Sequence, residues 1–343
     1  WKNTPNFNIT WTNPIEYSGV KGAWYKMGSP PTSNTDGTFT TNKPFTATTT
    51  IQGTQTLYIW LEDNLDQVNF NNYSTVDLRY ETVDPLKPLT ATADGSSPSP
   101  WKNTPTFSMT WTDPADMSGI KGAWYKIGRN PQLSTDGTFT ATRPFNVTAT
   151  QQPYQDVYIW LEDNAGNIGD YANERISVDL RYETTIPGTP TGLTADNSNP
   201  SLWKNTPGFS ITWAEDLVDI SRINGAWYKL GSPPTSNTDG TFTTSNPFIA
   251  TTTTQGTQTL YVWLEDNAGN RDYNNRAAVD LRYETTPPSA PTGLTADNSS
   301  PSPWKNTPTF SIEWSNPPDT SGIKGSWYKL GSPPTSNTDG TFT

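Results

Sequence analysis

The side chains of this sequence that could take part in chemistry are carboxylates and large aromatic rings, because its 343 residues include no histidine and no cysteine. Their absence excludes a Ser-His-Asp triad, a thiolate nucleophile and the usual zinc ligands. The sequence also lacks a glycine-rich phosphate loop. Glu162 and Asp163 could formally supply the carboxylate pair of a glycoside hydrolase, but the same pair recurs along the chain on a predicted turn. We therefore expect no enzyme activity.

Acidic residues recur in two turn-like segments. Asp113 and Asp116 lie in one segment, and Glu162 and Asp163 lie in the other. Calcium takes roughly six to eight oxygen ligands, so calcium is the one cofactor that we consider. The expected ligands, at junctions between repeats, are Asp113, Asp116, Asp163, Asp219 and Asp266. In the alternative interpretation these residues only form turns, and no EF-hand-type loop is present.

Tryptophan and tyrosine residues recur at outward positions of predicted strands. Alternation turns Val157 and Ile159 inward and therefore Tyr158 and Trp160 outward. The sequence thus predicts one exposed aromatic face in each repeat. These faces comprise Trp24, Tyr58, Trp60, Trp124, Tyr158, Trp160, Trp227, Tyr261 and Trp263.

Three interpretations of this aromatic face stay open. Lys26 and Arg79 could cover Trp24 and Trp60 through cation–π contacts, which would make each face self-contained. The face could instead pack against neighbouring repeats or copies of the chain in a fibre. It could also bind surface glycans, since flat aromatic rings stack on sugar rings.

All of these residues belong to a repeat of about 101 residues. WKNTP begins at Trp1, Trp101, Trp203 and Trp304, and GSPPTSNTDGTFT fills residues 28–40, 231–243 and 331–343. A period near 100 residues corresponds to a whole domain. We expect repeats at residues 1–84 (without its first strand), 85–186, 187–287 and 288–343 (truncated), within a longer periodic protein.

Short β-strands must position these side chains. Phe107, Met109 and Trp111 alternate with polar residues, which predicts a half-buried strand. Residues 120–127 predict another strand, with Tyr125 inward and Trp124 outward. A bulge near Gly122 could reverse the faces of the earlier residues of this strand. About seven such strands in each repeat predict an all-β fold, a tandem array of β-sandwiches.

The repeat resembles fibronectin type III and bacterial immunoglobulin-like domains. The resemblance lies in PSAPTGLTADN at residues 288–298, Trp314, PPDTSGI at residues 317–323 and DNAGN at residues 266–270. It is most similar to the tandem repeats of prokaryotic surface proteins, which implies an extracellular structural or adhesive role. In that topology the two acidic turns lie at the end where the preceding domain attaches.

The net charge of −11 argues against nucleic acid and anionic membranes as partners. No apolar run is long enough to insert into a membrane. The sequence therefore favours a non-catalytic extracellular rod, as the body of a cell-surface filament or sheath or the stalk of an adhesin. The alternative is a carbohydrate-binding accessory array of a secreted polysaccharide-active enzyme.

Overall fold

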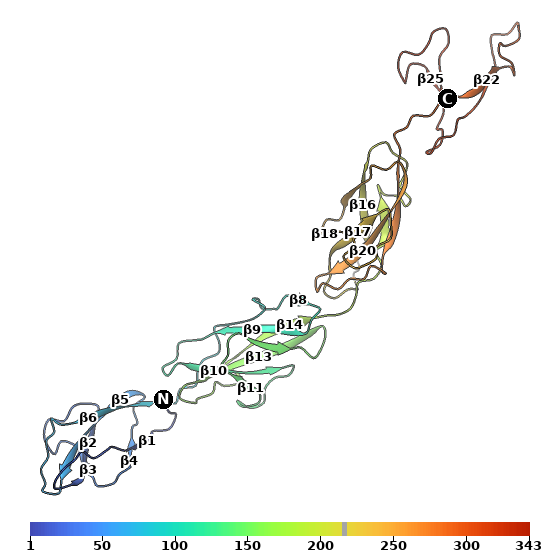
Figure 1. The fold of residues 1–343 in the computed structure, drawn as a ribbon. Helices are drawn as coiled ribbons and strands as arrows, with labels where there is room; N and C mark the ends of the chain where they lie inside the picture. Colours follow the sequence, from blue (N-terminus) through green and yellow to red (C-terminus); the bar gives the residue numbers. More distant parts are fainter. Residues whose placement is uncertain (215–217) are drawn as a thin grey trace. The chain divides into compact units, whose positions relative to one another are not determined.

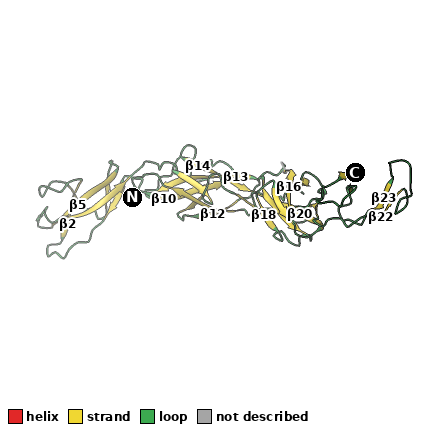
Figure 2. Ribbon diagram, turned by 90° about the horizontal axis from the view of Figure 1, so that it is seen from above, coloured by secondary structure: helices red, strands yellow, loops and turns green. Residues whose placement is uncertain are grey.

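The computed structural model describes residues 1–214 and 218–343. The chain divides into two compact units, Trp1–Thr184 and Thr185–Thr343, coloured from blue to green and from yellow to red in Figure 1. Every regular element of the described residues is a β-strand, as Figure 2 shows. The described residues contain no helix that is long and apolar enough to cross a bilayer.

The second repeat, in the first unit, contains a full set of strands. They are β7 (Thr90–Ala93), β8 (Trp101–Lys102), β9 (Thr106–Thr112), β10 (Ile120–Ile127), β11 (Thr138–Thr140), β12 (Phe145–Thr148), β13 (Tyr154–Asp163) and β14 (Arg175–Tyr182). One sheet has the order β12-β9-β7 and the other has the order β11-β10-β13-β14-β8. Two sheets of this kind, with their apolar faces in contact, form a β-sandwich.

The core of the second repeat follows the alternation of its sequence. Phe107 and Met109 of β9 are fully buried, and they belong to one cluster with Val157 and Ile159 of β13. The predicted bulge is confirmed, because the pairing of β10 with β13 shifts register between Ile120 and Gly122. The prediction of an all-β tandem sandwich is also confirmed, since the third repeat is built in the same way.

The third repeat opens the second unit. Its strands are β15 (Thr191–Ala195), β16 (Gly208–Ala214), β17 (Ile223–Leu230), β18 (Thr241–Thr243), β19 (Phe248–Thr251), β20 (Gly256–Asp266) and β21 (Ala277–Tyr283). Their orders are β15-β16-β19 and β18-β17-β20-β21. Two residues that the sequence places in an acidic turn of this repeat, Glu215 and Asp216, lie outside the described residues.

The first repeat has no strand equivalent to β7 or β15. Its strands are β1 (Asn6–Ile9), β2 (Val20–Met27), β3 (Thr38–Thr40), β4 (Phe45–Thr48), β5 (Gly53–Asp63) and β6 (Ser74–Tyr80). Here β1 pairs only with β4, while the other sheet keeps the order β3-β2-β5-β6. Val76 of β6 is consequently 44% exposed, whereas its equivalent in the second repeat, Val178, is fully buried.

The fourth repeat consists of two separate strand pairs. They are β22 (Thr292–Ala296) with β23 (Ile312–Ser315), and β24 (Trp327–Tyr328) with β25 (Thr341–Phe342). Leu294 and Trp327 are about half exposed in this repeat, and Trp304 is fully exposed. Leu294 lacks the opposing sheet that buries its equivalent Leu193 in the third repeat.

Candidate functional site

The predicted exposed aromatic face is wrong for one tryptophan in each complete sheet. Trp60, Trp160 and Trp263 are all 0% exposed. Their parity was predicted correctly, because they lie opposite the inward residues of β5, β13 and β20 and outside the main apolar clusters. They are buried because a loop folds back over the outer face of the sheet.

This loop is the repeated GSPPTSNTDGTFT segment, at residues 28–40 in the first repeat, and we call it the lid. The Trp60 Nε1 donates a hydrogen bond to the backbone oxygen of Asn34, at 2.9 Å. A Cβ atom added to Gly37 would lie 2.8 Å from the Trp60 ring. Glycine is therefore required at this position because the lid backbone lies directly against the indole.

The same lid covers the equivalent tryptophans of the next two repeats. Trp160 Nε1 donates to the backbone oxygen of Ser134 at 2.7 Å, and Trp263 Nε1 donates to that of Asn237 at 3.1 Å. The second lid, GRNPQLSTDGTFT at residues 128–140, differs in sequence yet makes the same bond. The shared requirement is thus a backbone carbonyl and a close glycine rather than particular side chains at the start of the loop.

An ion pair fastens each lid to the sheet. Lys26 of β2 contacts Asp36 of the lid at 2.8 Å, and Asp36 also accepts hydrogen bonds from the backbone and hydroxyl groups of Thr32. The Lys26 ammonium beside Asp36, helped by Thr32, lowers the pKa of that carboxyl to about 2. Asp239, bound by Lys229 in the third repeat, likewise has its pKa lowered to about 2. The expected stacking of Lys26 on Trp24 is thus replaced by a bond to the lid.

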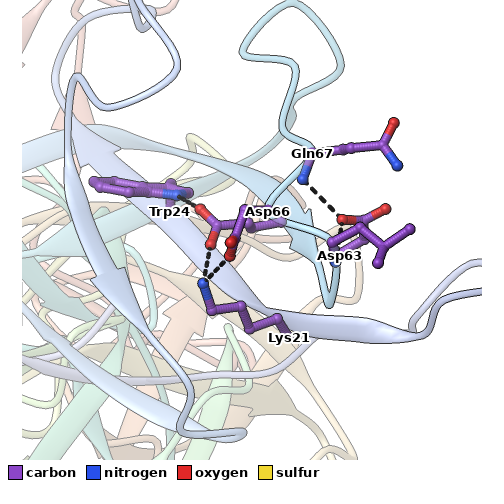
Figure 3. Close-up of polar contacts among 7 residues, drawn as sticks. Lys21, Trp24, Asp63, Asp66 and Gln67 are labelled. Carbon is purple, nitrogen blue, oxygen red and sulfur yellow. Dashed lines mark hydrogen bonds and ion pairs between the residues drawn. The ribbon is translucent and has the colours of Figure 1, made fainter.

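Trp24 remains half-buried at the edge of the lid. Its ring stacks on Trp60 with centroids 6.5 Å apart and planes 15° apart, and its Nε1 donates to Glu62 Oε2 at 2.7 Å. The Lys21 amino group contacts the carboxylates of Glu62 and Asp66, and Figure 3 shows Lys21 and Asp66 beside the Trp24 indole. Glu62 therefore joins Lys21 to Trp24, and its ion pair with Lys21 orients the carboxylate that holds the Trp24 indole.

The equivalents of Trp24 and Tyr58 are also half-buried. Trp124 and Trp227 donate to Glu162 and Glu265 at 2.8 and 2.7 Å, as Trp24 does to Glu62. The guanidinium of Arg175 lies over Tyr158, and that of Arg276 lies over Tyr261. Each aromatic face is therefore largely covered by its own repeat, as in the self-contained interpretation, although with different cations from those expected.

Arg79 was expected to cover Trp60, and its equivalents show why that prediction is wrong. Arg181 lies 5.8 Å from the ring of Trp101, and Arg282 lies 6.0 Å from that of Trp203. These arginines therefore contact the tryptophans of the WKNTP segments instead of the strand tryptophans. The lid occupies the place over the strand tryptophans, so no cation is needed there.

The acidic residues converge at the junction between the first and second repeats, within the first unit. Carboxylate oxygens of Glu81, Asp116 and Asp163 all lie within 4.8 Å of one another. Among the described residues, no ion pair joins these three carboxylates to a lysine or arginine. Burial raises the pKa of Glu81, and the neighbouring Asp116 adds to this rise.

Backbone and amide groups hold this acidic junction cluster in place. Glu81 Oε2 accepts a hydrogen bond from the Ser118 backbone N–H at 2.8 Å. Asp163, fully buried, accepts two hydrogen bonds at 2.8 Å from the backbone N–H and side-chain amide of Asn167. Asn167 also donates to the backbone oxygen of Glu81 at 3.2 Å. The carboxylates therefore connect the end of β6 to two turns of the next repeat.

The expected ligand Asp113 does not belong to this cluster. Its carboxylate pairs with Arg143 at 2.8 Å and accepts a hydrogen bond from Trp111 Nε1 at 2.8 Å. Glu162 also points elsewhere, to Lys121 and Trp124. Of the expected ligands in the second repeat, Asp116 and Asp163 thus come together, and Glu81 completes the set from the preceding repeat.

Asp219 and Asp266, the expected ligands of the third repeat, are both buried. Their carboxylate oxygens lie within 4.8 Å of one another. Asp266 accepts hydrogen bonds from the backbone N–H and the amide of Asn270, as Asp163 does from Asn167. The turn therefore repeats its geometry as well as its sequence.

The lid was missed at the sequence level, although a signal for it exists. A lysine ten residues before an Asp-Gly pair recurs at Lys26, Lys126, Lys229 and Lys329. Each of these lysines contacts the aspartate of that pair. Two oppositely charged residues at a constant spacing across a turn could have indicated a loop attached to a strand.

Comparisons with known proteins reveal similarity to solved structures alone, since no family model and no curated protein matches the sequence. One similar structure is that of the Clostridium thermocellum CbhA fibronectin(III)-like modules. It has 11% sequence identity and a TM-score of 0.33, over 57% of this chain and 94% of that chain. Another is that of the chicken CNTN1 FN1–FN3 domains, with 9% identity and a TM-score of 0.34, over 82% of this chain and 95% of that chain.

The class of the protein follows from its own sheets. A three-stranded sheet β15-β16-β19 facing a four-stranded sheet β18-β17-β20-β21 forms a seven-stranded sandwich of antiparallel strands. The chain is a tandem array of fibronectin type III-like β-sandwich repeats.

Proposed function

We propose that the chain is a non-catalytic structural part of an extracellular surface protein. It would form a semi-rigid rod, as the body of a filament or sheath or as the stalk of an adhesin. The observation that carries this proposal is the closure of the lid over an aromatic side chain in each of the first three repeats. Trp60, Trp160 and Trp263 lie buried beneath the lid of their own repeat, so these rings are not open to a ligand.

The junction inside the first unit supports a stiff connection. Besides the bonds of Glu81 to Ser118 and Asn167, the backbone N–H of Lys87 donates to Glu174 Oε2 at 2.9 Å. Asn3 of the first repeat donates to the backbone oxygen of Gly166 at 3.1 Å. Four polar contacts spread over several segments resist bending more than a single flexible linker does.

The burial of the strand tryptophans also weighs against the carbohydrate-binding alternative. That alternative needs flat, accessible rings, and Trp160 offers none because the lid covers it. Trp24 and its equivalents are half-buried and hydrogen-bonded to glutamate. Further copies of the chain are therefore the proposed partners of the structural role, and surface glycans are the partners that the alternative would require.

Small-angle X-ray scattering of the full chain tests the proposal. We expect an elongated particle to which each repeat contributes roughly 35–45 Å, from strands of about ten residues plus turns. A control variant with residues 83–88 replaced by Gly and Ser should scatter as a more flexible chain. If the unaltered protein scatters like that variant, the rod is wrong.

Glycan arrays and hydrolysis assays with the same protein examine the alternatives directly. The proposal expects neither glycan binding nor turnover of polysaccharides. The half-buried rings of the aromatic face are Trp24, Trp124 and Trp227. If the parent chain bound a glycan and replacement of these three residues by alanine abolished that binding, the accessory role would be favoured instead.

A further inference from the structure

The second repeat places two carboxylates opposite each other on the outer face of one sheet. Asp156 of β13 is the register partner of Asp179 of β14, and we call these two residues the aspartate pair. Their neighbours Val157 and Val178 are fully buried, so alternation turns both aspartates to the outer face. Directly opposite residues of antiparallel strands have Cβ atoms about 4.5–5.5 Å apart, and like charges at this spacing destabilise the strand pair. The repulsion acts between two interior strands of the sheet.

The first and third repeats have a favourable pair at the same position. There the hydroxyl of Thr56 donates a hydrogen bond to Asp77 at 2.8 Å, and that of Thr259 donates one to Asp280 at 2.8 Å. In the second repeat Asp156 stands where these repeats have threonine, so a hydrogen-bond donor is exchanged for a second negative charge. The repulsion therefore belongs to the second repeat and is not a requirement of the fold.

The groups that touch the aspartate pair neutralise it only in part. Among the described residues, the Arg181 guanidinium is the one cation within ion-pair distance, with its Nε 3.8 Å from Asp179. This arginine also lies over the ring of Trp101. The hydroxyl of Tyr158 donates to Asp156 at 3.0 Å. Burial raises the pKa of Asp179 and the charge of Asp156 adds to this rise, although Arg181 opposes it.

The remaining cations on the surrounding elements are engaged elsewhere or exposed. Lys126 of β10 is paired with Asp136 of the lid, and Lys102 of β8 is paired with Asp94. Arg129, exposed at the start of the second lid, forms no ion pair within the part of the chain that the structure describes. None of these cations supplies the second positive charge that two ionised carboxylates would need.

We propose that the aspartate pair shares one proton in mildly acidic solution and that this proton strengthens the contact between β13 and β14. The proton comes from the solvent. Once one carboxyl is protonated, its O–H donates to the other carboxylate, and a hydrogen bond replaces the repulsion. At neutral pH both groups are ionised and repel each other across the two strands. The pair is thus a pH-sensitive switch that is confined to the second repeat.

The switch lies where two further segments attach to this sheet. The backbone oxygen of Asp179 accepts a hydrogen bond from the Ser99 N–H at 2.9 Å, and that of Asp156 accepts one from the Gly128 N–H at 2.8 Å. Ser99 belongs to the segment before β8, and Gly128 begins the second lid. Loosening of β13 against β14 at neutral pH should therefore weaken the attachment of both segments.

The expected pH dependence has a defined sign. A carboxyl whose pKa in the folded state is raised above its ordinary value of 3.8 stabilises the fold in acid, and this contribution is lost as the pH rises through the folded value. Hydrogen exchange of the full chain at low ionic strength, between about pH 4.5 and about pH 7.5, tests the switch. The protection factors of the amides in residues 154–163 and 175–182, relative to intrinsic rates at the same pH, should fall about threefold as the pH rises.

Asp156→Thr is the matched variant, because the first and third repeats fold with threonine at this position. It should lose the threefold fall. Glu81 and Asp84, whose pKa values are also raised, are the same in both chains, so the difference between parent and variant measures the aspartate pair alone. Equal pH dependence of parent and variant would overturn the inference.

The reciprocal variant transfers the switch to the third repeat. Thr259→Asp places a carboxylate opposite Asp280 and should introduce the same fall in the protection of residues 256–266. Thr257→Asp is its control, since this position lies on the same strand but opposite Arg282, and no fall should follow. Thr259→Asp without a pH dependence would likewise overturn the inference. Neither result bears on the scattering experiment, so the proposed structural role is tested separately.

Discussion

Single residues inside each repeat explain why its aromatic side chains are hidden. Trp160 projects from the outer face of its sheet, yet its indole N–H donates a hydrogen bond to the Ser134 backbone oxygen of the lid, and a Cβ atom added to Gly137 would lie 2.7 Å from its ring. A second, small core thus forms on the face of the sheet that alternation predicts to be exposed to solvent. The cost of losing such a residue should match that of a core residue.

We expect Trp160→Ala to destabilise the second repeat by about 3–5 kcal/mol, as large-to-small core substitutions do. Calorimetry of the full chain should show one unfolding transition shifted to lower temperature. Trp304→Ala provides the control, because Trp304 is fully exposed and its removal should change stability by less than about 0.5 kcal/mol. Equal effects of the two changes would contradict the buried lid core.

The lids should open in acid. The lysine partners lower the pKa of Asp36 and Asp239 to about 2, below the ordinary value of 3.8. A carboxyl with a lowered pKa stabilises the fold above its unfolded pKa, and this contribution is lost as pH falls from about 4 through about 2. The protection factors of the amides in residues 28–40 and 231–243, which compare the measured exchange rate with the intrinsic rate at the same pH, should fall in this range.

Asp36→Asn should abolish the acid-induced opening of the first lid and leave the acid-induced opening of the third repeat's lid unchanged. The asparagine cannot titrate. The protection of the amides in the first lid should therefore no longer change between about pH 4 and about pH 2. An unchanged acid step in this variant would show that another group controls lid opening.

At the scale of elements, turns from two repeats and the end of β6 build the acidic junction cluster. Calcium there stays a prediction of this sequence, and its ligand set is now Glu81, Asp116 and Asp163 without Asp113. Burial and the neighbouring Asp163 and Asp170 also raise the pKa of Asp84, close to the same junction. A cation would relieve this accumulation of negative charge.

Calcium should therefore raise the melting temperature of the first unit, and a chelator should reverse the effect by mass action. Glu81→Gln should abolish the response, whereas Asp113→Asn should retain it, since Asp113 pairs with Arg143. If neither calcium nor chelator moves the melting temperature, the cluster is only a hydrogen-bonded turn junction.

At the scale of the whole molecule, the second and third repeats each have two complete sheets of their own, and we expect them to fold as separate bodies. Limited proteolysis should accordingly release stable fragments of roughly 11 kDa, about one 101-residue period of the 37.8 kDa chain. The second and third repeats should give the most resistant fragments because both of their sheets are complete. Continuous degradation without such fragments would contradict independent sandwiches.

Much of this fold could be predicted because β-structure has a period of two and the repeat shows the pattern several times. The inward positions Phe107, Met109 and Ile159 and the bulge at Gly122 follow from alternation and from the cost of burying Lys126. These are local properties of single strands. The sequence by itself thus determined the strands, their two faces, the period and the absence of the usual catalytic side chains.

Only the tertiary structure decided which outward-facing positions are exposed to solvent. Parity turns Trp60 away from the main core, but parity says nothing about a loop of 13 residues that returns over the same face. The sequence placed Asp116 and Asp163 at the same junction, but it could not show that Asp113, three residues before Asp116, pairs with Arg143 instead. Closure of this kind depends on where chain segments meet in space, and the alternation of residues within a strand does not encode that meeting.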